Sequence, residues 1–401
     1  MTRSVLFNLK SIIYNPKSTK SGFTIVELLV VIVVIGILAA ITIVSYTGIS
    51  SKAIVASLTS DLDNASKQMK LYYIDHGNYP VTLNSSNCPT DPADTKYCLK
   101  PSSDTTFTYS TLGVATNPQS FALQATKSGT SYIIANNTTP AQISANPTNL
   151  NCPSGFIPVP GSITYGTADF CVMKYEAKNA GGGVPESTES GAPWVNISQT
   201  TAITNSANVA ACTDCHLITE AEWLTIAQNV LSVNSNWSDG TVGNGCIFRG
   251  NVGTLDACGY DGADPEFGTG RNAKASLTLT NGEVIWDFAG NVWEWTSGTS
   301  TTGQPGITGE SAYAWKQWNT VTTAGTLSPS VLPSDTGISG AGDWTSTKGI
   351  GQLFSNASET GLRGFRRSGG PSGSGTGGVL TLYLTDDPSY ASAFIGFRVS
   401  R

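Results

Sequence analysis

The hydrophobic residues of this chain are concentrated in one long run near its N-terminal end. The run FTIVELLVVIVVIGILAAITIV begins at Phe23 and contains a single charged residue, Glu27. Beyond it, apolar residues recur at spacings of three and four as far as Tyr72, and Pro80 lies just past the end of the pattern. This periodicity predicts one helix over 23–73, which would be about 75 Å long at a rise of 1.5 Å per residue.

The rest of the chain alternates short β-prone runs with segments rich in Gly, Asn and Pro. Three such runs follow the helix and predict a small antiparallel sheet that packs on it. Residues 136–151 lack apolar periodicity and contain two prolines, so we expect a linker there. The linker separates a domain over 23–135 from a larger one over 152–401. The predicted strands are Thr106–Tyr109, Ser120–Gln124 and Tyr132–Ala135.

The charge balance argues against a nucleic-acid-binding protein. Lys and Arg total 22 against 28 Asp and Glu, a net charge of −6, and no basic cluster occurs after residue 22. Nucleic acid is therefore not expected as a partner. Charged residues make up only 12% of the chain, which also contains 43 Gly. This composition is typical of an exported, β-rich surface protein.

A basic segment precedes the apolar run and indicates a membrane. Residues 1–22 contain Arg3, Lys10, Lys17 and Lys20 and no acidic residue. An apolar stretch of about 20 residues is long enough to cross a bilayer as a helix. A carboxylate within it is costly in lipid, which marks Glu27 as a functional residue. The alternative is a plain signal anchor with Glu27 at the lipid headgroups.

These residues resemble the leader of type IV prepilins. The resemblance implies that a prepilin peptidase cuts between Gly22 and Phe23 and that the new N-terminus is methylated. It further implies that Glu27 pairs with the amine of a neighbouring Phe23 during filament assembly, a buried ion pair that sets register. The segment LYYIDHGNYP (Leu71–Pro80) is similar to the helix exit of pilins and type II secretion pseudopilins.

The implied partners are therefore other pilin subunits, the peptidase and an inner-membrane assembly platform. The implied location is the cytoplasmic membrane as a single-pass protein with a cytoplasmic N-terminus, and then an extracellular pilus or the cell surface.

Four strings in the larger domain resemble the formylglycine-generating, sulfatase-modifying family, which has a C-type-lectin-like fold. The fold class expected is thus α+β: a long pilin helix on a small antiparallel sheet, then a lectin-like α+β domain. Read from the residues alone, Thr219 is a helix N-cap, and Trp293 and Trp295 are core aromatics on one strand face. The strings are GFIPVP with DFCVMKYEAKN, LITEAEW, WDFAGNVWEWTSG and FIGFRVSR.

Catalysis is not expected. The oxidising members of this family carry an active-site cysteine pair in the segment that corresponds to Arg363–Arg398, whereas the last cysteine here is Cys258. Without a thiolate in that segment, the oxidation has no reagent.

The family resemblance also implies a calcium site. Its ligands would be Asp287, Gly290, Val292 and Glu294, an oxygen-only set that suits a hard cation. The alternative is a tight turn with Asp287 as its cap. A second acidic loop, with Asp256, Asp261, Asp264 and Glu266, lacks the order of an EF-hand, and we expect it to be solvated.

All eight cysteines are disulfide candidates, because an exported chain experiences oxidising conditions. Cys88 and Cys98 flank one polar loop. The motif Cys212-Thr-Asp-Cys215-His216 could also attach a c-type haem, and we favour a local disulfide. Sequence does not decide the connectivity of the others, although Cys152 with Cys171 and Cys246 with Cys258 are reasonable pairs.

The segment over 366–398 is the candidate ligand-binding surface. It resembles the ligand-facing surface of lectin-like variable proteins, in which adenine-directed mutagenesis by retroelements rewrites codons. Tyr, Ser, Gly and Asp on such a surface suit adaptable binding. The alternative is an ordinary loop with its rings turned inward. The candidate binding residues are Arg366, Ser368, Tyr383, Asp386, Asp387, Ser389, Tyr390, Ser392 and Phe394.

Together these features predict a minor or tip type IV pilin-like subunit with a non-catalytic, lectin-like adhesin domain and a diversified binding surface. Its ligand would be an extracellular glycan, a polymer or a cell-surface protein. One alternative is a structural pseudopilin that primes a secretion or competence filament. A family-type oxidase and a c-type haem carrier are the enzymatic and electron-transfer alternatives.

Overall fold

The structure is a computed structural model. It describes residues 24–112, 118–136, 138–144, 147, 150–253, 257–259, 272–301, 303–321, 346–371 and 376–401, without the side chains of 40–48, 112, 272 and 273. The cleavage residues Gly22 and Phe23 and the second acidic loop's Asp256, Asp261, Asp264 and Glu266 lie outside these ranges. The chain divides into two compact units, Met1–Ala53 and Ile54–Arg401.

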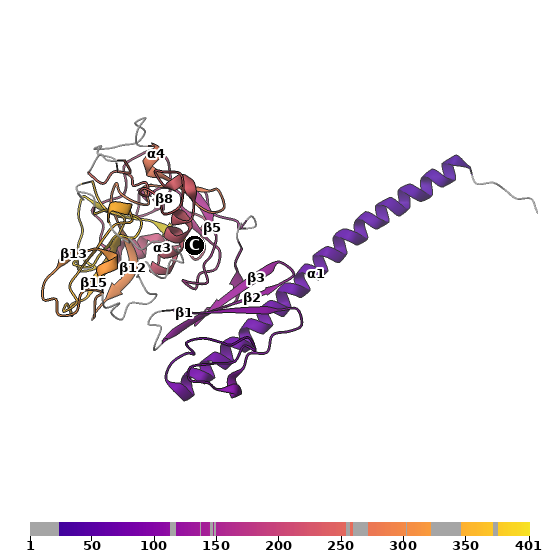
Figure 1. Ribbon diagram of the computed structural model, residues 1–401. Coiled ribbons are helices and arrows are strands. Elements are labelled where there is room, and N and C mark those ends of the chain that lie inside the picture. Colours follow the sequence, from indigo (N-terminus) through magenta and orange to yellow (C-terminus); the bar gives the residue numbers. More distant parts are fainter. Residues whose placement is uncertain are drawn as a thin grey trace, which may run out of the picture. The chain divides into compact units, whose positions relative to one another are not determined.

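The first unit contains the N-terminal part of helix α1 (Ile25–His76), which appears in indigo in Figure 1. The helix predicted over 23–73 is therefore confirmed. Its large apolar side chains in this unit are exposed, with Ile25 at 84% and Ile37 at 55%. Such a surface needs a covering partner. Among the residues that the structure describes, no helix meets the length and apolarity needed to cross a membrane.

In the second unit, the remainder of α1 packs on a four-stranded antiparallel sheet. Leu58, Leu62 and Met69 are fully buried on one stripe of the helix and contact Phe121 and Leu123 of the sheet. The predicted sheet is thus confirmed, with one further strand. The strands, in spatial order, are β1 (Thr106–Leu112), β2 (Ser120–Lys127), β3 (Thr130–Ala135) and β4 (Ala141–Gln142).

The C-terminal part of this unit is α+β. It contains a six-stranded sheet with the strand order β13-β14-β16-β15-β12-β17 and a four-stranded sheet with the strand order β5-β6-β18-β9. In addition, β7 pairs with β8 and β10 pairs with β11. The strands are β5 (Phe156–Val159), β6 (Phe170–Met173), β7 (Lys178–Asn179), β8 (Pro185–Glu186), β9 (His216–Leu217), β10 (Ser276–Thr278), β11 (Val284–Trp286), β12 (Trp293–Ser300), β13 (Ala314–Lys316), β14 (Leu353–Ser355), β15 (Arg363–Arg367), β16 (Leu382–Tyr383), β17 (Ile395–Phe397) and β18 (Val399–Ser400).

The helices of this part are α2 (Gln199–Ser206), α3 (Glu220–Leu231) and α4 (Asn272–Ala275). Short 3-10 helices lie at Thr95–Tyr97, Asn234–Asn236, Trp318–Thr320 and Ser346–Lys348. Thr219 caps α3, as its sequence predicts, in a capping box with Glu222. The mixed α+β class is confirmed, and the lectin-like assignment stays a prediction.

Two buried ion pairs fix the six-stranded sheet. Arg367 on β15 pairs with Glu220 of α3, at 2.5 Å between Nη2 and Oε2, and Arg398 pairs with Glu294 on β12 at 3.0 Å. All four side chains are nearly or fully inaccessible. Removing one partner of such a pair leaves an uncompensated buried charge, so we expect the loss of any of these four side chains to destabilise the sheet.

Candidate ligand-binding surface

A continuous row of side chains crosses five strands of the six-stranded sheet. Strand pairing places Trp315 opposite Phe354, Phe354 opposite Tyr383, Tyr383 opposite Arg366, and Arg366 opposite Trp295. Directly paired residues point to the same face of a sheet. We call these five residues, with Trp293 two positions before Trp295, the aromatic row. Figure 1 labels β12, β13 and β15 of this sheet.

The opposite face of the same strands belongs to the core. Leu353 on β14 and Leu382 on β16 are fully buried in the main hydrophobic cluster. Each immediately precedes a member of the aromatic row, and successive residues of a strand point to opposite faces. The row therefore lies on the face that is directed away from the main core.

Burial decreases along the row. Trp295 is fully buried in a cluster with Ile197 and Ala202, and its indole N–H donates to the Ile197 carbonyl at 2.9 Å. Phe354 and Tyr383 are half-buried, and Trp315 on the edge strand β13 is 36% exposed. The row thus has one end anchored in the protein and one end open to a ligand.

Four rings of the row, those of Trp293, Trp315, Phe354 and Tyr383, contact one another. The Phe354 ring is stacked on the Tyr383 ring, with centroids 4.5 Å apart, and lies 4.9 Å from the Trp315 ring. The Trp293 ring lies 5.3 Å from that of Tyr383. These offset and tilted contacts are favourable for aromatic pairs and restrict each ring's motion. The surface is consequently preorganised.

Arg366 joins the aromatic row to the loop between β16 and β17. Its guanidinium carbon lies 4.1 Å from the Tyr383 centroid and 5.2 Å from that of Trp293. Its Nη2 lies 2.5 Å from Asp386 Oδ2. Burial lowers the pKa of Arg366 and raises the pKa of Asp386, and the attraction between the two charged groups opposes both shifts. Tyr390 also interacts electrostatically with Arg366. The structure thus brings together four of the predicted binding residues, Arg366, Tyr383, Asp386 and Tyr390.

The other predicted binding residues have different surroundings. Asp387 and Ser389 are exposed, and the Asp387 carboxylate caps the Ser389 N–H at 2.8 Å. Phe394 is 52% exposed, and Ser392 is partly buried. Ser368 is fully buried, and its hydroxyl accepts from the Gly290 N–H and donates to the Gly290 carbonyl. Because Ser368 is inaccessible, we leave it out of the proposed surface.

Sequence analysis missed Trp315 and Phe354. They lie on strands of three residues, β13 and β14, which are too short to give an alternating pattern. It also treated Trp293 as a core residue, whereas the structure leaves this ring half-buried beside Arg366. The sequence did contain one signal for this site, because aromatic residues occur along the chain both before and after the segment that contains Arg366.

The predicted calcium ligands lie in and beside the turn before β12. Asp287 is 7% exposed and has a positive φ of 54°, and the carbonyl of Gly290 accepts from Ser368. The Val292 N–H donates to Glu176. Both carboxylate oxygens of Glu294 accept from Arg398, at 3.2 and 3.0 Å. Asp287 is thus a buried carboxylate at the position that the family resemblance assigns to a ligand, and Glu294 is held by Arg398.

Glu176 is a buried carboxylate that sequence analysis did not select. Its side chain is 2% exposed and accepts from Asn291 Nδ2 at 2.5 Å. Burial, with repulsion from Asp287 and Glu294, raises the pKa of Glu176 well above its ordinary value. Arg398 thus interacts electrostatically with Glu176 as well as with its ion-pair partner Glu294. Of the residues that the structure describes, no group of three or more His, Cys, Asp and Glu side chains is arranged to hold a metal ion.

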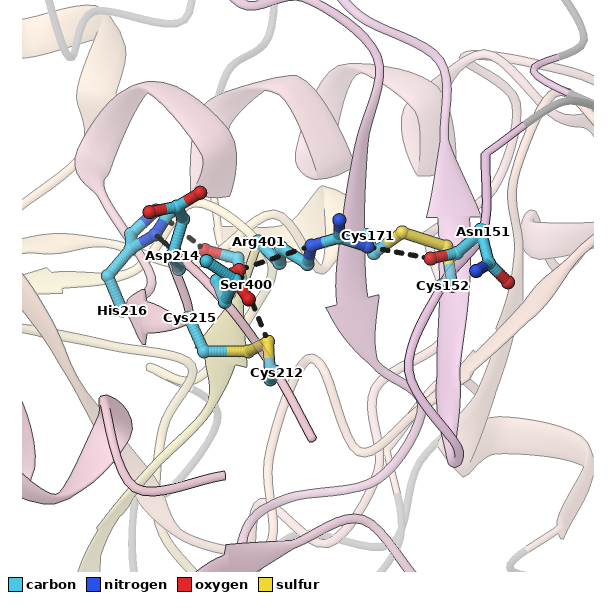
Figure 2. Close-up of a disulfide and its surroundings, with 10 residues drawn as sticks. Asn151, Cys152, Cys171, Cys212, Asp214, Cys215, His216, Ser400 and Arg401 are labelled. Atoms are coloured by element: carbon cyan, nitrogen blue, oxygen red, sulfur yellow. Dashed lines mark hydrogen bonds between the residues drawn. A yellow bond between two sulfur atoms is a disulfide. The ribbon is translucent and has the colours of Figure 1, made fainter. Parts of the chain in front are cut away.

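The eight cysteines form four disulfides, in the pairs considered from sequence. They are Cys88–Cys98, Cys152–Cys171, Cys212–Cys215 and Cys246–Cys258. Figure 2 shows two of them on either side of Arg401, whose guanidinium donates to the Thr213 and Asn151 carbonyls. In this structure the two sulfurs of the C-x-x-C-H motif are bonded to each other.

His216 of this motif contacts α3 and β18. Its Nε2 lies 3.1 Å from Glu222 Oε1. Figure 2 shows its contacts with Ser400, whose hydroxyl is 3.2 Å from Nε2, and with the Asp214 carbonyl, 2.9 Å from Nδ1. Burial alone would lower the pKa of His216, but the hydrogen bond and charge of Glu222 raise it to about 9. The ring is thus a cation at neutral pH that joins the disulfide-bonded loop to the helix.

Comparison with known proteins bears on the N-terminal residues. Residues 17–43 match the prokaryotic N-terminal methylation motif. The N-terminal segment is that of a type IV pilin or pseudopilin. Over 77 residues the chain is 31% identical to the type IV major pilin protein PilE1 of Neisseria gonorrhoeae, which covers 19% of this chain and 47% of that protein.

Over 66 residues the chain is 36% identical to the type II secretion system core protein G of Aeromonas hydrophila, covering 16% of this chain and 46% of that protein. The chain spans about half the length of these curated relatives. The pilin-like N-terminus predicted from Gly22, Phe23 and Glu27 is confirmed by these matches.

Proposed function

We propose that this protein is a minor or tip subunit of a type IV pilus-like filament, and that its C-terminal part is a non-catalytic ligand-binding domain. The single observation that carries the binding function is the aromatic row, half-buried and open at Trp315. The domain would be C-type-lectin-like, its surface would be diversified between related chains, and calcium at Asp287 would stabilise it.

The N-terminal segment supports the filament part of the proposal. A methylation motif suits a subunit that is first held in the cytoplasmic membrane as a single-pass protein. The prepilin peptidase would then cleave it, and it would assemble with other pilin subunits on an inner-membrane platform. The exposed apolar side chains of α1 between Ile25 and Leu38 would be covered first by lipid and then by neighbouring helices. The filament would carry the C-terminal part outside the cell.

The size of the C-terminal part supports a minor or tip position. Residues 152–401 make up more than half of the chain. Such a bulky domain is sterically difficult to accommodate at every repeat of a filament. A subunit at the tip meets no such limit and contacts an external ligand first.

The chemistry of the aromatic row supports binding. Interfaces are enriched in Trp, Tyr and Arg, and Trp and Tyr give large rigid contacts at little cost in side-chain entropy. The row contains Trp315, Tyr383 and Arg366 together, and Tyr390 (46% exposed) and Phe394 lie on the loop that follows β16. An ordinary solvated loop has no need of such rings.

A structural pseudopilin is the second candidate, since one group of relatives is named as a core protein of a type II secretion system. Such a subunit would prime or extend a filament and would bind no external ligand. The two candidates differ in whether the aromatic row affects adhesion.

The test uses full-length protein expressed in a pilus-bearing bacterium that lacks its own copy. Filaments from wild-type and Trp315→Ala plus Tyr383→Ala strains are sheared, and incorporation is compared with adhesion to cells and surfaces. We expect equal incorporation and a loss of adhesion in the double variant. Equal incorporation with unchanged adhesion would instead favour the structural pseudopilin.

A further inference from the structure

We propose that the ligand of the aromatic row is an uncharged polysaccharide whose sugar rings stack on the row. This inference rests on the proposed function, because it names the chemical class that the same surface binds. Three features support it: the cluster of rings with Trp315 exposed at its edge, an arginine–aspartate pair beside the rings, and the local charge.

The rings lie on the face of a sheet and are fixed by their neighbours. Phe354 is stacked between Tyr383 and Tyr313, whose centroids lie 4.5 and 5.7 Å from its own. Gly370 lets the Trp293 indole lie against the backbone, because a Cβ at this position would be 2.9 Å from the ring. Because Tyr383 and Tyr313 cover the faces of Phe354, a sugar ring would stack on the exposed Trp315, whose negative face attracts weakly positive C–H groups. An extended polymer can follow a row of this kind, whereas a small molecule gains more from an enclosed pocket.

Arg366 and Asp386 provide hydrogen-bonding groups beside the rings. The Arg366 and Asp386 side chains are 9% and 17% exposed, and Arg366 Nη2 lies 2.5 Å from Asp386 Oδ2. The adjacent Asp386 carboxylate accepts hydrogen bonds. A donor and an acceptor side by side suit neighbouring hydroxyl groups of a sugar, each of which both donates and accepts.

The charges near Arg366 disfavour an anionic polymer. Arg363 and Arg366 provide two positive charges, whereas Glu359, Asp386 and Asp387 provide three negative ones. Single-stranded nucleic acid also stacks on aromatic rings, but its binding sites combine those rings with a basic groove. The net charge of the whole chain is −6. An uncharged polymer avoids this repulsion.

The test measures binding of the detergent-solubilised full-length protein by affinity electrophoresis. The probes are the uncharged polysaccharides dextran, mannan, xyloglucan and hydroxyethyl cellulose, with alginate and oligothymidylate as anionic comparators. We expect retardation by at least one uncharged polysaccharide and none by the comparators. Trp315→Ala and Tyr383→Ala should each weaken this binding by roughly tenfold, the order found for stacking platforms.

Two control variants keep the result interpretable. Trp315→Tyr retains a ring and should retain most of the binding, which separates loss of stacking from loss of folding. Tyr175→Ala removes a half-buried ring that pairs with Trp286, 5.9 Å away and outside the row, and should leave binding unchanged. Equal weakening by Tyr175→Ala and Trp315→Ala would overturn the proposed site.

The failure of this inference can be distinguished from that of the proposed function. If filaments adhere through the aromatic row but no uncharged polysaccharide binds, the polysaccharide assignment is wrong and the adhesin proposal stands. If the comparators bind more tightly than the uncharged polymers, the charge argument is wrong. If neither adhesion nor polysaccharide binding depends on the row, both proposals are contradicted.

Discussion

The guanidinium carbon of Arg366 lies 4.1 Å from the centroid of the Tyr383 ring, and the two residues are direct partners in the pairing of β15 with β16. A cation over an aromatic face is stabilising, more so when it is shielded from water. Arg366 also forms an ion pair with Asp386 on the following loop. One side chain therefore joins the sheet, the rings and the loop that together form the proposed binding surface.

The ion pair gives a prediction for Asp386→Asn. The Arg366 and Asp386 side chains are 9% and 17% exposed, so the substitution leaves a largely buried guanidinium without its anion. We expect the free energy of unfolding to fall by about 2 kcal/mol. Urea denaturation of the full-length protein measures it. The neighbouring Asp387→Asn is the matched control, because Asp387 is exposed and its carboxylate caps Ser389 without forming a buried ion pair. Equal losses in both variants would contradict this role of the ion pair.

The sequence was informative where patterns are long and local. Regular apolar spacing predicted α1 and the burial of Leu58, Leu62 and Met69, and the capping residues predicted the start of α3 at Thr219. These features depend on residues within a few positions of one another. Spacing alone was therefore sufficient to place them.

The candidate site was only partly predictable, because tertiary pairing creates it. Trp315 and Tyr383 are distant in sequence, and their rings come within 5.6 Å because β14 lies between β13 and β16. The burial of Ser368 also results from a long-range contact, with Gly290. A lone carboxylate such as Glu176 carries no spacing signal, since its neighbours come from the distant turn before β12.

His216 makes stability dependent on pH. Its pKa is raised from the ordinary 6.5 to about 9 in the folded protein. A cation whose folded pKa exceeds its unfolded pKa contributes stability that is fully present below pH 6.5 and is lost as the pH rises through about 9. We expect the free energy of unfolding to fall over this window in the wild type.

The comparison for this pH effect is His216→Gln. Glutamine retains hydrogen bonding to Glu222 but does not titrate, so the fall in stability between pH 6.5 and about 9 should be smaller in this variant. Chemical denaturation at half-unit pH steps measures both proteins. Identical pH profiles for the two would contradict the proposed role of the imidazole.

Calcium should stabilise the C-terminal part. Glu176, Asp287 and Glu294 are buried, and repulsion from Asp287 and Glu294 contributes to the raised pKa of Glu176; a cation bound at Asp287 would reduce this repulsion. We expect millimolar calcium to raise the unfolding temperature of the wild type and to have little effect on Asp287→Asn. Equal unfolding temperatures of the wild type in calcium and in chelator would contradict the predicted site.

Glu27→Ala should separate processing from assembly. In this structure the Glu27 carboxylate accepts from the N–H and the hydroxyl of Thr24, both at 2.8 Å. The proposed assembly role instead pairs it with the amine of a neighbouring Phe23. We expect Glu27→Ala to be cleaved normally and to be absent from sheared filaments, as measured by immunoblotting of membrane and filament fractions. Normal incorporation of this variant would exclude the ion pair, and Glu27→Asp is the control that retains the charge.

The central claim is that a cleaved pilin segment carries the C-terminal part outside the cell within a filament. Mass spectrometry of sheared, washed filaments tests it most directly. The account predicts a methylated N-terminal peptide that starts at Phe23, together with peptides from 152–401, in the same filament fraction and at low abundance relative to the major subunit. A chain that stays in the membrane fraction with residues 1–22 uncleaved would contradict the account.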